Sequence, residues 1–145
     1  MSESNNTEAI RSWFRACDAL VAGTRFNADF VAGRSTEYAI YSVPSSLNYR
    51  KNILGDEVLA NDQTQNFIFA AELPYGEDAQ QNLANLGFMQ TIMNWVITQN
   101  AARNFPDWDG GSVKSILPTQ TSAPVRVGGS SAKYQFQIKV DYRRA

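Results

Sequence analysis

Apolar residues recur at helical spacing in two stretches of this chain. In the first, steps of three and four residues build one apolar stripe between residues 10 and 21. We expect Asn5 or Asn6 to cap this helix and Gly23 to end it. The stripe consists of Ile10, Trp13, Phe14, Cys17, Leu20 and Val21.

The second helical stretch runs from about residue 78 to residue 104, before Pro106. Apolar coverage wider than one stripe predicts a helix that lies across a sheet and has apolar surface left for a neighbour. Its expected core stripe consists of Leu83, Leu86, Met89 or Gln90, Met93, Val96 and Ile97, broadened by Phe88, Ile92 and Trp95.

Strand patterns fill most of the remaining chain. Residues 37–43 are β-branched and aromatic, residues 66–71 are apolar on both faces, and residues 113–117 form another short strand. Residues 118–131 are expected to be loop, whereas the strict alternation from Tyr134 to Arg143 predicts a strand with one buried face. This order predicts one α+β domain over residues 1–145, with a mixed or antiparallel β-sheet packed by two main α-helices.

A long polar stretch, residues 45–65, interrupts this pattern. Gly55-Asp56 is a turn signal, so we expect an extended hairpin, or arm, with residues 47–54 leading out and residues 57–71 returning. Charges of both signs suit a specific register on a partner. The alternative is a solvated hairpin whose charges pair with one another. The candidate interface residues of the arm are Arg50, Lys51, Asp56, Glu57 and Asp62.

The charge balance excludes several function classes. The sequence has 13 Lys and Arg against 14 Asp and Glu, a formal net charge of -1. Because there is no basic excess to neutralise phosphates or to attract an anionic membrane, we expect neither nucleic-acid recognition nor membrane binding. The polar, acidic start of the chain, without a cationic leader, predicts folding in the cytoplasm.

Side chains suited to catalysis or metal binding are scarce. The chain contains no histidine, which removes the commonest general base and metal ligand. Its one cysteine, Cys17, lies on an apolar stripe and is expected in the core. Asp107, Asp109 and Gly110 resemble the start of a calcium loop, but the later ligands are missing, so a turn is expected. We therefore predict no enzymatic activity and no catalytic, metal-binding or cofactor-binding residues.

Trp108 follows Pro106 in this turn. Since tryptophan is enriched at interface hot spots, an exposed Trp108 is a further candidate contact with a partner.

Several framework stretches carry a resemblance to a known family. Across its length the chain resembles phage minor-capsid and tail-completion proteins of the tail-terminator type. The stretches are residues 10–14 (IRSWF), 37–41 (EYAIY), 63–69 (QTQNFIF) before 74–76 (PYG), 82–88 (NLANLGF) and 134–142 (YQFQIKVDY).

This resemblance implies a structural virion protein that is assembled in the host cytoplasm. Such a protein forms a sixfold ring with copies of itself at the head-proximal end of a phage tail. The ring ends polymerisation of the tail tube protein and joins the tail to neck or connector proteins, while DNA passes through the lumen unread. Two alternatives stay open: another neck or head-completion component, and a small cytoplasmic enzyme.

Overall fold

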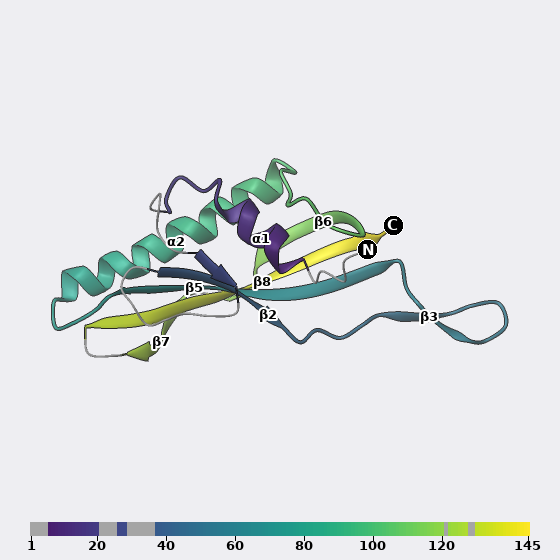
Figure 1. Cartoon of the computed structure of the whole chain (residues 1–145), viewed down its shortest axis with the longest axis horizontal. Helices are drawn as coiled ribbons and strands as arrows, with labels where there is room; N and C mark the ends of the chain where they lie inside the picture. The colour runs from purple at the N-terminus through teal and green to yellow at the C-terminus, as the bar shows by residue number, and fades with distance from the viewer. Residues whose placement is uncertain (1–5, 21–25, 29–36, 121, 128–129) are drawn as a thin grey trace.

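A computed structural model describes residues 6–20, 26–28, 37–120, 122–127 and 130–145 of the chain. Within these residues the α+β class is confirmed by two α-helices, α1 (Thr7–Phe14) and α2 (Ala79–Ala101), and eight β-strands (Figure 1). The strands are β1 (Phe26–Ala28), β2 (Glu37–Val43), β3 (Tyr49–Lys51), β4 (Glu57–Leu59), β5 (Asp62–Pro74), β6 (Gly111–Pro118), β7 (Ala123–Val127) and β8 (Ser131–Arg144).

One twisted sheet forms the body of the molecule. Its strand order is β1-β2-β5-β8-β6, and β7 pairs with β8 on the same side as β6. Every pairing is antiparallel except that of β1 with β2, which is parallel. The long strands β5 and β8 lie at the centre, and their register places Phe69 opposite Phe136.

The hydrophobic core lies between this sheet and the two helices, which cover the same face (Figure 1). Strand β8 contributes every second residue to the core, because successive side chains of a strand point to opposite faces. The predicted set Tyr134, Phe136, Ile138 and Val140 is buried, as expected. Aromatic rings join the helix and sheet layers, with the ring centroids of Phe14 in α1 and Phe69 in β5 5.0 Å apart.

Helix α1 is shorter than the apolar spacing predicts. It ends at Phe14, and Cys17 is buried in the core beyond its last turn. Val21 and Gly23 lie outside the described residues, as does Asn5. The predicted side-chain cap is wrong for Asn6, because its amide bonds the backbone of Asp109 instead, accepting from the N–H at 2.7 Å and donating to the carbonyl at 3.2 Å.

Helix α2 begins where the sequence predicts, after Asp78, whose carboxylate accepts a hydrogen bond from Gln80 N at 3.0 Å. Its buried face confirms Met89, Met93 and Val96 of the predicted stripe, together with Ile92, but differs from the prediction elsewhere. The buried residues are Asn85, Met89, Ile92, Met93 and Val96, whereas Leu83, Leu86 and Ile97 are exposed.

A hydrogen bond explains the orientation of α2. The side chain of Asn85 donates to the carbonyl of Pro74 at 2.6 Å and lies 3.5 Å from the hydroxyl of Tyr134. Because a helix that is apolar on several sides gains similar hydrophobic contact in several orientations, this buried amide helps to select one of them. In the part of the chain that the structure describes, no helix is long and apolar enough to span a bilayer.

Two short strands lie outside the sequence prediction. Strand β7 falls in the stretch expected to be loop, and a bulge between Pro124 and Arg126 interrupts its pairing with β8. Strand β1 adds three residues beside β2. Both strands are too short to show a clear alternation of apolar and polar residues in the sequence. They are recognised only by their hydrogen-bonded pairing with β2 and β8.

Candidate assembly interface: the arm and its root

The predicted arm is confirmed as a hairpin that extends beyond one end of the sheet (Figure 1). Strands β3 and β4 pair with each other in a separate two-stranded sheet, with Tyr49 opposite Leu59 and Lys51 opposite Glu57. The return limb is not continuous, because β4 ends at Leu59 and β5 begins at Asp62. We call residues 49–59 the arm and the junction around Asn48, Ala60 and Gln63 the arm root.

The turn at the end of the arm has a defined backbone. The side-chain oxygen of Asn52 accepts hydrogen bonds from Leu54 N at 2.9 Å and Asp56 N at 3.0 Å. Gly55 has a φ of 86°, a left-handed conformation that favours glycine. This ordered turn places two large aliphatic side chains in water, since Ile53 is 99% exposed and Leu54 is 81% exposed. We call Ile53 and Leu54 the arm tip.

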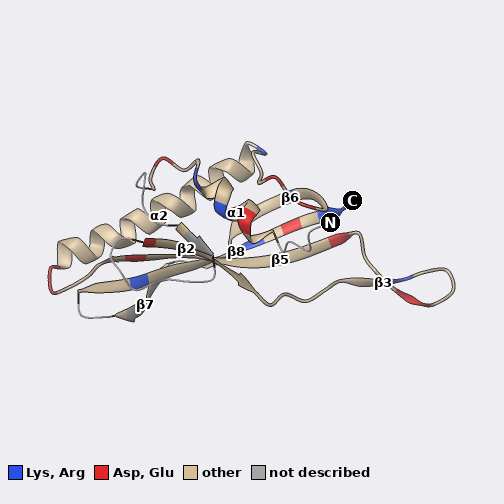
Figure 2. Ribbon diagram, viewed as in Figure 1, with Lys and Arg blue, Asp and Glu red and all other residues tan. Residues whose placement is uncertain are grey.

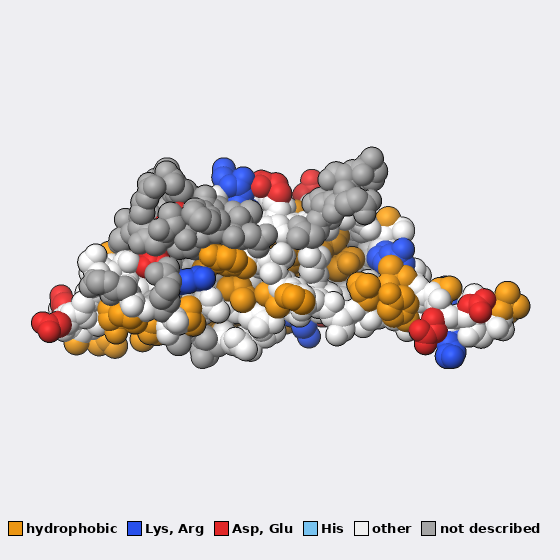
Figure 3. Space-filling model, turned by 60° about the horizontal axis from the view of Figure 1, so that its bottom comes forward, with side chains coloured by type: hydrophobic (Ala, Val, Ile, Leu, Met, Phe, Trp, Pro, Cys, Tyr) orange, Lys and Arg blue, Asp and Glu red, His pale blue; other side chains and the backbone are white. Residues whose placement is uncertain are grey.

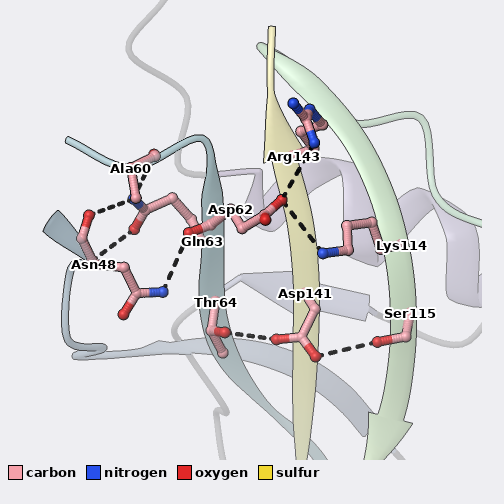
Figure 4. Close-up of polar contacts among 9 residues, drawn as sticks. All are labelled: Asn48, Ala60, Asp62, Gln63, Thr64, Lys114, Ser115, Asp141 and Arg143. Carbon is pink, nitrogen blue, oxygen red and sulfur yellow. Dashed lines mark hydrogen bonds and ion pairs between the residues drawn. The ribbon is translucent and has the colours of Figure 1, made fainter. Parts of the chain in front are cut away.

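The arm root is held by the buried side chain of Gln63 (Figure 4). Its oxygen accepts from Asn48 N at 3.0 Å, and its amino group donates to the carbonyls of Asn48 and Ala60, both at 2.8 Å. Asn48 in turn donates from its side chain to the carbonyl of Asp62 at 3.2 Å. The two limbs of the arm are therefore tied to each other and to the first residues of β5.

Charged side chains of three body strands surround this root (Figure 4). The carboxylate oxygen Oδ1 of Asp62 forms ion pairs with Lys114 Nζ of β6 at 3.3 Å and with the guanidinium of Arg143 of β8 at 4.0 Å. Asp141 accepts hydrogen bonds from Thr64 at 2.5 Å and from Ser115 at 3.2 Å. These contacts join β5, β8 and β6 at the end of the sheet from which the arm leaves.

The last residues of β8 also reach the arm. Arg144 donates from its guanidinium to the carbonyls of Leu59 and Ala60, at 3.3 and 3.4 Å, and from its backbone to Asn61 at 2.7 Å. From the sequence alone, Arg144 is expected to be solvated, as a residue close to a terminus, or to contact a neighbouring copy. In this structure it supports the arm of its own chain.

The structure separates the predicted interface residues into two groups. Arg50, Lys51, Asp56 and Glu57 are exposed on the arm, whereas Asp62 lies at the root (Figure 2). Lys51 and Glu57 face each other across the hairpin, yet no ion pair among the described residues involves a charge of the arm. The alternative of a solvated hairpin predicts ion pairs between the charges of the two limbs. The structure shows no such pair within the arm.

Trp108 is not the exposed side chain that an interface contact requires. It is only 7% exposed, and its ring centroid lies 4.9 Å from that of Tyr142 and 6.2 Å from that of Phe67. The hydrogen bonds of Asn6 to Asp109 fold this turn against the sheet, which explains the burial. The indole N–H is buried without a hydrogen-bond partner among the described residues.

The arm tip was not recognised in the sequence. The available signal was a pair of large aliphatic residues, Ile53 and Leu54, directly before the turn glycine of a polar stretch. Two adjacent large aliphatic residues at a turn indicate a binding surface more strongly than a single apolar surface residue does. The tip of a two-stranded hairpin has no core in which such side chains can be buried.

The described residues give little support for a metal site or for a reactive cysteine. No group of His, Cys, Asp and Glu side chains there is arranged to hold a metal ion. Burial raises the pKa of the Cys17 thiol, which disfavours the nucleophilic thiolate. In comparisons with known proteins, no family model and no curated protein matches the chain.

Proposed function

We propose that this chain is a non-enzymatic structural subunit of a phage tail. Copies of it form a ring, with sixfold symmetry, at the head-proximal end of the tail. The ring ends polymerisation of the tail tube and joins the tail to the neck. The framework resemblance supplies the family, and one observation supports an assembly role: an ordered arm that carries its apolar tip, Ile53 and Leu54, away from the body.

An arm of this kind is suited to binding another protein surface. Burying one large aliphatic side chain contributes about 1.5–3 kcal/mol, and the tip offers two such side chains. The hydrogen bonds of Asn52 order the turn before binding, so less conformational entropy is lost in the complex. The bonds of Gln63 and Arg144 hold the arm root and therefore limit the directions in which the arm points.

The charges of the arm supply specificity around this apolar tip. Arg50 and Lys51 lie on the outgoing limb, and Asp56 and Glu57 lie on the returning limb, all of them exposed. Exposed charges at the rim of an interface mainly set register and the rate of association. The arm thus combines an apolar anchor with polar surroundings, the usual composition of a protein interface.

Electron microscopy of the purified protein, alone and mixed with tail tubes, tests this proposal. We expect a ring bound at one end of each tube, and tubes that stop growing when the protein is added during their polymerisation. The chain with its arm shortened serves as the control and should leave tube growth unlimited. A ring found only on the neck side of a head would favour the alternative of a neck component. Failure to form a ring under any of these conditions would refute the proposal.

A further inference from the structure

The arm has two open edges. Strands β3 and β4 pair only with each other within the described part of the chain, so each keeps one edge without a strand beside it. Both strands extend beyond the body, where no other described element lies alongside them (Figure 1). An isolated two-stranded hairpin is at most marginally stable in water, and proteins usually cover or pair such edges. The arm therefore has backbone groups available to a further strand.

The hydrogen bonds of the hairpin show which residues face these open edges. Asn52 N donates to the carbonyl of Asp56 at 2.9 Å. Bonded and non-bonded pairs alternate along an antiparallel ladder, so the next pair, Lys51 and Glu57, has its backbone N–H and C=O groups directed outward. The carbonyl of Leu59 accepts from the arginine at the end of β8. The free part of the β4 edge is therefore at Glu57.

The two limbs of the arm carry charges of opposite sign. Arg50 and Lys51 are exposed on the outgoing limb, and Asp56 and Glu57 are exposed on the returning limb (Figure 2). The arm as a whole is neutral, but one of its strands is basic and the other is acidic. Figure 3 shows both signs at the arm, next to the hydrophobic side chains of its tip. Pairing two β3 edges or two β4 edges would bring like charges together, whereas a β4 edge attracts a β3 edge.

We propose that the arms of adjacent copies pair edge to edge, the β4 edge of one copy with the β3 edge of the next. This inference rests on the proposed ring and names the contact that joins its copies. If the arms run along the axis of the ring, neighbouring arms are parallel and lie at the same height. Strand β4 is then antiparallel to the next copy's β3, and the register within the hairpin is repeated between copies.

This register places all four charges of the arm next to a charge of opposite sign. Glu57 lies directly opposite the next copy's Lys51, and the outward backbone groups of both residues face each other. On the other face of the strands, Asp56 lies diagonal to the next copy's Arg50, within reach of a long side chain. The contact joins two different edges, so it is heterologous and repeats from copy to copy until a ring closes. Every arm tip then points toward one face of the ring and stays available to the tail tube.

Two charge reversals, Lys51→Glu and Glu57→Lys, test this contact. Each places like charges on the facing edges of neighbouring copies. Each also places like charges opposite each other within its own hairpin, so the variants are compared mixed as well as alone. Arg103→Glu is the matched control, since Arg103 is an exposed residue outside the arm and the change in charge equals that of Lys51→Glu. Circular dichroism establishes the fold of each variant before the assembly measurement.

Sedimentation of the variants, alone and mixed, provides the measurement. At concentrations where the unsubstituted chain and the control associate, each reversal alone should associate at least about tenfold more weakly. An equimolar mixture should recover association. In it, the unchanged Glu57 of one variant faces the unchanged Lys51 of the other, and the two substituted side chains attract each other at the next contact. Repulsion within each hairpin is the same in the mixture, so the recovery comes from contacts between copies.

Three outcomes would overturn the inference. If either reversal associates like the unsubstituted chain, the copies join through other surfaces. If the mixture associates as weakly as each reversal alone, the two edges are not partners. If the unsubstituted chain is monomeric at every concentration measured, the arms do not pair with one another. In each case, rings bound to tail tubes in electron micrographs would still support the proposed function, whereas their absence would refute it.

Discussion

Gln63 links the arm to the body through a side chain rather than through strand pairing. Its amide bonds both backbone groups of Asn48 and the carbonyl of Ala60. Gln63 is only 2% exposed, so its amide depends on these protein partners rather than on water. A hydrogen bond of this kind typically contributes about 0.5–1.5 kcal/mol net to stability.

We predict that Gln63→Leu lowers the free energy of unfolding by about 1–3 kcal/mol, because it removes the three hydrogen bonds that the buried Gln63 amide makes with Asn48 and Ala60. Urea denaturation measures this change. Gln137→Leu is the control, since Gln137 is half-buried on the sheet face away from the helices, and its effect should stay within about 0.5 kcal/mol. Equal effects of both substitutions would contradict the role assigned to Gln63.

Strand β8 is the element on which the body depends, since it pairs with β5, β6 and β7. Its register with β5 brings Phe136 against Phe69, and both rings are buried beneath the helices. The strand also ends at the arm root, through Arg144. It therefore connects the hydrophobic core with the element proposed to bind a partner.

Phe136→Ala should lower the free energy of unfolding by about 3–5 kcal/mol, because it removes a buried aromatic ring and leaves a cavity. Gln137→Ala, one residue along and on the opposite face, should have a much smaller effect. Thermal and urea denaturation of both variants provide the measurement. An unchanged melting temperature for Phe136→Ala would show that the strand does not pack as described.

The arm, by contrast, should be dispensable for folding. Replacing residues 50–58 with Asn-Gly leaves the pair of Tyr49 and Leu59 joined by a two-residue turn, a length that suits a hairpin. We expect the melting temperature to change by only a few degrees, since surface loop tips tolerate such changes. Tails assembled with this variant should lose length control or fail to join heads. Normal tails and normal infectivity would contradict a role of the arm in docking.

In the part of the chain that the structure describes, positive and negative residues are interspersed along the elements rather than gathered in one basic region (Figure 2). Its formal net charge is -1. Proteins that bind DNA without sequence preference depend on many Lys and Arg contacts with phosphates, and this dependence makes their affinity sensitive to salt. The proposed ring would therefore surround DNA without binding it tightly.

We therefore expect no binding of random-sequence duplex DNA at physiological salt and about 10 μM protein, a concentration at which many non-specific binders are detected. Fluorescence anisotropy with a labelled duplex is the measurement, and a basic DNA-binding protein is its positive control. Binding that falls steeply as salt is raised would contradict this expectation.

The sequence by itself determined those helices, strands and turns whose residue pattern lies within one short segment of the chain. The alternation of apolar and polar residues predicts β8 and its buried face, and the β-branched run before Pro44 predicts β2 with the bounds that the structure has. Asp78 marks the start of α2, and Gly55-Asp56 marks the turn of the arm. Each of these features depends on residues within one or two turns or strand repeats, so no distant partner is needed to define it.

Only the tertiary structure decided which residues at the start of α2 are buried, where Trp108 lies and how the arm is held. Asn85 faces the sheet because its partners are Pro74 and Tyr134, and Trp108 is buried because Asn6 holds the neighbouring Asp109. Gln63 and Arg144 support the arm through residues that precede them by 3 to 85 positions. A periodic pattern contains no information about such pairs, since their energy depends on distances that exist only after the chain has folded.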